Sequence, residues 1–172
     1  MTTLRTSSLP RSFRPGRRTA VALLVGAGVV LSPLPAQAAP ASTQTAAAPA
    51  AVVAPNPTAQ VAVDTALAQL GKGYAWAGVG PNVYDCSGLT QFAYRAAGVA
   101  LPHSSGMQST MGVPVSRADL QPGDLVFYYS PVGHVGMYIG NGLMVHAPSA
   151  GDVVKITSVD AMWGYNTARR LT

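Results

Sequence analysis

The chain has 172 residues, a length suited to one domain, and carries a formal net charge of +5. The positive excess belongs to the start of the chain, because five arginines lie within the first eighteen residues. From residue 39 onward, six basic residues balance six aspartates, so this part is neutral. The distribution excludes nucleic acid as a partner.

The N-terminal segment predicts a secretory signal peptide over residues 1–38. Basic residues precede an apolar run, Ala20–Leu31, and an Ala-x-Ala cleavage pattern follows at Ala36–Ala38. The alternative is a membrane anchor, but the apolar run is shorter than the roughly 20 residues that span a bilayer. The expectation is a secreted protein of the extracellular space or cell wall, with no stable membrane anchor after cleavage. The pair Arg17-Arg18 leaves twin-arginine export open beside general secretion.

Residues 39–57 consist almost entirely of Ala, Pro, Thr, Gln and Val, a composition that predicts a disordered linker. Asn56-Pro57 then has the pattern of a helix cap followed by a first-turn proline. It predicts a helix that runs to about Leu70 and ends at Gly71. The folded domain is therefore predicted over residues 58–172.

The chain contains one cysteine, Cys86, which follows a glycine-rich segment predicted as an irregular loop over Gly71–Tyr84. Apolar residues after Cys86 recur at helical spacing until Gly98, which predicts a helix with the cysteine at its N-terminus. The helix dipole and free N–H groups there favour a thiolate. A single cysteine in an exported protein cannot form an internal disulfide, so an intermolecular bridge, an inert buried thiol and a nucleophile are the alternatives.

A short helix is expected through Met107 and Met111, and after Pro122-Gly123 the apolar period changes to two. The predicted strands are Leu125–Tyr129, His134–Ile139, Leu143–Ala147, Val153–Thr157 and Asn166–Leu171. Helices followed by strands predict an α+β fold in which an antiparallel sheet packs on the cysteine helix.

The hairpin between the second and third of these strands decides whether two histidines share a face. A two-residue turn at Asn141-Gly142 puts His134 and His146 on opposite faces and mixes apolar with polar residues. A three-residue loop, 140–142, instead pairs Ile139 with Leu143. Apolar residues then gather on one face and both histidines on the other, so this register is favoured.

Gly136 then leaves room between the two histidines. Cys86, His134 and His146 have the residue types of a nucleophile, a base and a group that orients the base. Cys86 is predicted to attack a carbonyl, with its own N–H as an oxyanion donor. The alternatives are two ordinary surface histidines or a zinc site, for which these residues offer only three ligands.

Several of these segments together resemble the NlpC/P60 family of papain-like cell-wall cysteine peptidases. The matching motifs are Tyr74-Ala75-Trp76-Ala77-Gly78, Asp85-Cys86-Ser87-Gly88-Leu89, Leu101-Pro102-His103-Ser104-Ser105, Gly123-Asp124-Leu125-Val126-Phe127, His134-Val135-Gly136-Met137-Tyr138-Ile139-Gly140 and His146-Ala147. The resemblance covers residues 58–172. It implies a papain-like α+β fold and hydrolysis of peptidoglycan stem peptides, usually between D-glutamate and meso-diaminopimelate.

The resemblance implies Cys86 as the nucleophile, His134 as the base and His146 as the third catalytic residue. Tyr74 matches a tyrosine that lies by the nucleophile and helps the oxyanion. Asp85 matches a position that contacts substrate in some members, although it also suits a helix cap.

Ser87 matches a second such position, with the alternative that it satisfies a first-turn N–H. His103 stands where arginine is common in the family, and it is expected to contact substrate. Ala77 replaces a usual glycine, which is expected to alter the loop beside Tyr74. Asp124 follows Pro122-Gly123 and is interpreted as a turn residue.

The main expectation is a secreted, monomeric peptidoglycan endopeptidase that needs no cofactor and no metal. An amidase that cuts the sugar–peptide bond and a non-catalytic wall-binding domain are the alternatives.

Overall fold

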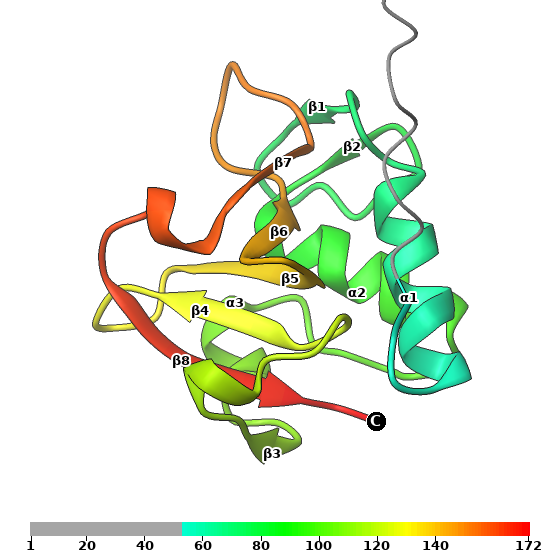
Figure 1. Cartoon of the computed structure of the whole chain (residues 1–172). Coiled ribbons are helices and arrows are strands. Elements are labelled where there is room, and N and C mark those ends of the chain that lie inside the picture. Colours follow the sequence, from blue (N-terminus) through cyan, green and yellow to red (C-terminus); the bar gives the residue numbers. More distant parts are fainter. Residues whose placement is uncertain (1–52) are drawn as a thin grey trace, which may run out of the picture. The chain divides into compact units, whose positions relative to one another are not determined.

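The computed structural model describes residues 53–172. The predicted signal peptide and most of the predicted linker lie outside this part of the chain. The helices are α1 (Pro57–Leu67), α2 (Cys86–Ala96) and α3 (Ser105–Gln108) (Figure 1). The strands are β1 (Gly73–Tyr74), β2 (Val83–Tyr84), β3 (Val113–Pro114), β4 (Leu125–Tyr128), β5 (His134–Gly140), β6 (Leu143–His146), β7 (Lys155–Ser158) and β8 (Tyr165–Arg170). Short 3-10 helices span Arg117–Asp119 and Val159–Ala161.

α1 begins as predicted but ends earlier. The side chain of Asn56 accepts the N–H of Ala59 at 2.8 Å, and Pro57 occupies the first turn. The predicted end at Leu70 was wrong, because the last backbone bonds tighten to a spacing of three residues beyond Leu67. No helix within residues 53–172 has the length and hydropathy needed to cross a bilayer.

α2 begins at Cys86, as predicted, and is followed by Gly98 with a φ of 80°. The short helix expected near Met107 is α3, which ends at Gln108 rather than at Met111. The segment predicted as an irregular loop holds β1 and β2, which pair in parallel. Two-residue strands carry no periodic signal, so the sequence does not reveal them.

The main sheet has six strands in the order β3-β8-β4-β5-β6-β7, with antiparallel neighbours throughout. The five predicted strands are all present, with shifted ends, and β3 was missed. β4 stops before Tyr129, whose φ of 74° is incompatible with a strand. β7 begins at Lys155 rather than Val153.

The hairpin of β5 and β6 combines the two registers weighed from the sequence. Met137 pairs with Val145 and Tyr138 with Met144, which is the favoured register. The predicted pair of Ile139 with Leu143 was wrong, because an irregularity before Gly140 pairs Gly140 with Leu143 across Asn141-Gly142. Both turn residues have positive φ, 52° and 72°, as a two-residue hairpin turn requires. The bulge thus keeps both histidines together despite the short turn.

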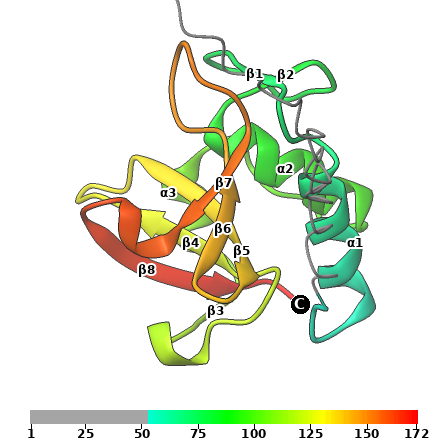
Figure 2. The ribbon, with the colours of Figure 1, turned by 45° about the horizontal axis from the view of Figure 1, so that its top comes forward.

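Apolar side chains cover both faces of the sheet. Figures 1 and 2 both show α1 and α2 on one side of it. The core on this side contains Ala62, Val63, Leu89, Ala93, Val135, Met137 and Val145. A smaller cluster on the other face contains Val126, Tyr128, Met144, Val159 and Ala168. The antiparallel sheet therefore packs on the cysteine helix, as predicted.

Candidate active site

A cavity of about 380 Å³ opens where the N-terminus of α2 meets the start of β5. Its volume falls in the range of sites that hold small ligands. Six of the residues predicted to act on the substrate line it: Tyr74, Asp85, Cys86, Ser87, His103 and His134. The folded chain thus collects residues from four separate segments around one thiol.

Cys86 is the first residue of α2 and is partly buried. Asp85 caps the helix, because its Oδ1 accepts the N–H of Gly88 at 2.7 Å. Gly88 is required here, since a Cβ on it would lie 1.9 Å from the carbonyl oxygen of Gly78. The loop that carries Tyr74 therefore packs directly against the first turn of α2.

The surroundings of Cys86 favour the thiol, contrary to the expectation from its helix position. Burial raises the pKa of Cys86, and the carboxylate of Asp85 adds to the increase. Backbone N–H groups, that of Val135 foremost, act in the opposite direction without outweighing burial. The prediction of a thiolate rested on the helix terminus alone, whereas burial of the sulfur away from water disfavours the anion.

His134 and His146 lie in contact, as the favoured register requires. Nε2 of His134 is 2.9 Å from Nδ1 of His146, and both side chains are buried. Nδ1 of His134 is the ring nitrogen that takes no part in this contact. His146 does not line the cavity itself, and its contact with His134 connects it to the cavity wall.

Both histidines are neutral near pH 7. Burial foremost, together with the proximity of His146, lowers the pKa of His134 to about 4. Burial likewise lowers the pKa of His146 to about 4, with a contribution from Lys155. The free site therefore pairs a neutral thiol with a neutral imidazole.

Tyr74 lines the cavity from β1. Burial raises the pKa of its phenol, and the charges of Cys86 and Asp85 contribute. The phenol therefore keeps its proton at neutral pH and is able to donate a hydrogen bond to a nearby anion.

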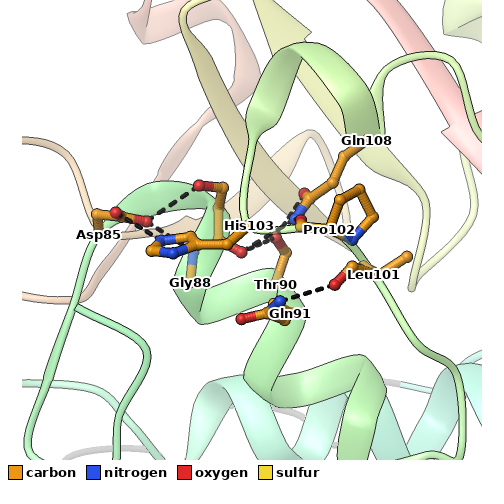
Figure 3. Close-up of polar contacts among 9 residues, drawn as sticks. Asp85, Gly88, Thr90, Gln91, Leu101, Pro102, His103 and Gln108 are labelled. Carbon is orange, nitrogen blue, oxygen red and sulfur yellow. Dashed lines mark hydrogen bonds and ion pairs between the residues drawn. The ribbon is translucent and has the colours of Figure 1, made fainter. Parts of the chain in front are cut away.

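Asp85 is the centre of a polar network shown in Figure 3. Its Oδ2 pairs with Nε2 of His103 at 2.7 Å, and its Oδ1 accepts the hydroxyl of Ser87 at 3.1 Å. The alternative that Asp85 caps the helix is thus present in the structure. Ser87 donates to Asp85 rather than satisfying an N–H of the first turn.

Gln108 holds the loop that carries His103 against α2, a role that the sequence did not suggest. Its fully buried amide donates to the carbonyls of Pro102, at 2.8 Å, and Ser87, at 3.0 Å (Figure 3). The hydroxyl of Thr90 donates to its Oε1 at 2.7 Å. A glutamine at the end of a four-residue helix has no periodic signal, and only the fold shows this network.

Two further residues of the cavity wall have unusual features. Trp76 is 87% exposed at the rim. Ala77, which replaces the usual glycine of the family, has a φ of 61°. Glycine adopts this left-handed conformation without the strain that an L-residue incurs.

Asp124 lies outside the cavity lining, and its role is structural. The carboxylate is 2% exposed and pairs with the guanidinium of Arg170 at 2.7 Å. Among residues 53–172, no group of three or more His, Cys, Asp or Glu side chains could hold a metal ion.

Comparisons with known proteins agree with the resemblance seen in the sequence. The profile of the NlpC/P60 family matches residues 71–171. A probable endopeptidase of Mycobacterium tuberculosis is 47% identical over 108 residues, which are 63% of this chain and 28% of that protein. A probable endopeptidase of Corynebacterium glutamicum is 42% identical over 123 residues, which are 71% of this chain and 59% of that protein. The chain thus spans less than two thirds of either relative.

Solved structures give the same result for the fold. An NlpC/P60 family protein from Bacillus cereus superposes with a TM-score of 0.63 at 38% identity, over 69% of this chain and 41% of that one. The NlpC/p60 domain of the peptidoglycan hydrolase SagA superposes with a TM-score of 0.61 at 31% identity, over 66% of this chain and 98% of that domain. The predicted α+β, papain-like fold is confirmed.

Proposed function

Because the chain belongs to the NlpC/P60 family, we propose that it is a peptidoglycan hydrolase that cleaves stem peptides as a cysteine endopeptidase. The bond assigned to it is the one between D-glutamate and meso-diaminopimelate. The cavity carries this proposal, because it unites Cys86 at a helix N-terminus with His134, which is bonded to the buried His146.

Acylation starts with attack of the Cys86 sulfur on the D-glutamyl carbonyl carbon. Nδ1 of His134 takes the thiol proton in the same step, because both groups are neutral before substrate arrives. The imidazolium then donates from Nε2 to Nδ1 of His146, along the existing 2.9 Å contact. His146 thereby stabilises a cation that burial alone disfavours.

The tetrahedral intermediate places a negative charge on the former carbonyl oxygen. The backbone N–H of Cys86 and the phenol of Tyr74 are assigned to this oxyanion. His134 returns its proton to the departing diaminopimelate amine as the carbon–nitrogen bond breaks. A water, deprotonated by His134, then hydrolyses the thioester and restores the thiol.

The acyl portion of the stem peptide is assigned to the wall formed by Asp85, Ser87 and His103. Asp85 is fixed by three bonds to neighbouring groups, so the wall is organised before substrate binds. The protein is proposed to act outside the cell or in the cell wall, as a monomer, after removal of residues 1–38.

Mass spectrometry of peptidoglycan digested by the protein tests the assignment, with Cys86→Ala as the matched control. New ends between D-glutamate and diaminopimelate, absent from the control digest, are expected. Release of intact stem peptides would replace the endopeptidase with an amidase. Unaltered peptidoglycan from a folded protein would favour a wall-binding domain.

A further inference from the structure

An aromatic pair, in which Trp163 is exposed and Tyr129 is half-buried, has no part in the proposed chemistry. Trp163 is 79% exposed, and its ring centroid is 4.8 Å from that of Tyr129, with 53° between the ring planes. The indole forgoes the burial that makes tryptophan stabilising in a core. A single exposed apolar residue needs no explanation, so the question is whether the pair is held in place.

The backbone around the pair is organised to hold the two rings together. Tyr129 has a φ of 74°, which is costly for a bulky side chain. Its N–H donates to the carbonyl of Gly164 at 2.6 Å, and its carbonyl accepts from the amide of Asn166 at 2.8 Å. A Cβ on Gly164 would lie 3.1 Å from the Tyr129 ring. Two hydrogen bonds thus hold Tyr129 in a strained conformation against Gly164. Backbone strain of this kind is concentrated at functional sites.

Tyr129 adjoins a residue of the cavity wall. Gly133 lines that cavity, and a Cβ on it would lie 3.5 Å from the ring of Tyr129. Tyr128 pairs with His134 in the sheet, so Tyr129 follows directly after the partner of the base. Figures 1 and 2 both show the turn between β4 and β5 beside the segment that leads into β8.

We propose that Tyr129 and Trp163 form a platform for a sugar ring of the peptidoglycan glycan strand while its stem peptide occupies the cavity. The inference rests on the proposed peptidoglycan substrate. D-glutamate and diaminopimelate are charged and offer little apolar surface to an indole. A pyranose ring instead presents a flat face of C–H groups, whose positive polarity suits the negative face of an aromatic ring. Asn166 is exposed beside the pair and supplies an amide for sugar hydroxyls.

The first test compares a substrate with sugar and one without. Initial rates are measured on intact peptidoglycan and on a synthetic, sugar-free stem peptide. Trp163→Ala is expected to lower kcat/KM on peptidoglycan by about tenfold while leaving the sugar-free rate unchanged. Trp163→Phe should restore most of the loss. Val113→Ala removes another exposed apolar side chain, on β3, and should change neither rate.

The second test measures binding without turnover, so it succeeds or fails independently of the proposed bond specificity. Calorimetry on Cys86→Ala with a tetramer of N-acetylglucosamine should give saturable binding that Trp163→Ala weakens by about tenfold. Undetectable binding, or binding that Trp163→Ala leaves unchanged, would overturn the platform. So would an equal loss of rate on both substrates, which would assign Trp163 to the peptide. A mass in sedimentation equilibrium that falls on substitution of Trp163 would assign the pair to contact between copies.

Discussion

The imidazole rings of His134 and His146 meet edge to face, with 5.2 Å between their centroids and 2.9 Å between Nε2 and Nδ1. Both rings are buried, and Nε2 of His146 has no hydrogen-bond partner within residues 53–172. A proton added to either ring must therefore be held in largely desolvated surroundings. This relationship determines how the site responds to pH and to substitution.

Stability is expected to fall as the pH drops from about 6.5 to about 4. An unfolded histidine binds a proton as the pH falls through about 6.5, whereas burial lowers the pKa of both folded histidines to about 4. The unfolded state thus binds more protons in this window, and acidification favours it by up to about 1.4 kcal/mol per pH unit for each histidine. Urea unfolding at several pH values measures the slope. The double variant His134→Gln/His146→Gln should show a flatter dependence, and parallel curves would contradict the prediction.

The thiol of Cys86 is expected to react slowly at neutral pH in the free protein. Burial raises its pKa, so little thiolate is present at pH 7. The rate of alkylation by iodoacetamide should keep rising with pH through the ordinary range of a thiol pKa and reach its plateau only above that range. Alkylation that reaches its plateau below pH 7 would instead reveal a preformed thiolate–imidazolium pair. His134→Ala, which removes the positive partner of such a pair, separates the two outcomes.

Substitution of the two histidines should affect turnover unequally. His134→Ala removes the proposed base and is expected to reduce kcat by about 10² to 10⁴-fold. His146→Ala leaves Nδ1 of His134 in place and removes only its support, so the loss should stay below about 10²-fold. His146→Asn, whose side-chain oxygen can still accept the hydrogen bond from Nε2 of His134, should recover part of the lost kcat. Equal losses of kcat in variants with unchanged melting temperature would contradict the division of roles.

Ala77→Gly is expected to stabilise the protein. The φ of 61° at Ala77 costs an L-residue about 1–2 kcal/mol, and glycine avoids this strain. Part of the gain is lost, because glycine also gives the unfolded chain more conformational freedom. A net gain of about 0.5–1 kcal/mol should appear as a higher melting temperature in calorimetry. Gly151→Ala, at a φ of 84° and with no heavy atom within 4 Å of the added Cβ, is the reverse control and should lower it. A lower melting temperature for Ala77→Gly would show that the methyl group contributes packing that outweighs the strain.

Gln108→Leu should destabilise the domain and weaken substrate binding. The substitution takes the amide away from the carbonyl of Pro102, at a cost of about 1–3 kcal/mol for a group that stays buried, whereas the hydroxyl of Thr90 still donates to the carbonyl of Ser87 at 2.9 Å. The loop with His103 should then move, which raises KM more than it lowers kcat. Gln91→Leu loses a single bond, to the carbonyl of Leu101, and should have the smaller effect. A loss of stability with an unchanged KM would restrict Gln108 to a structural role.

Sequence patterns alone determined the α+β class, the position of Cys86 at a helix start and the placement of His134 and His146 on one face. These features depend on local signals: the cap at Asp85, the helical period after it and the alternation along the strands. The motifs also identified most of the residues that line the cavity.

Tertiary structure decided the features that depend on contacts between distant segments. The bulge before Gly140 allows a two-residue turn while both histidines stay on one face of the sheet. The apolar period of the sequence does not predict this bulge. The pKa of Cys86 is set by desolvation, which exists only once the sheet covers the helix terminus. Gln108 and the pair of Tyr129 with Trp163 likewise acquire their partners only through the fold, because those partners lie far away along the chain.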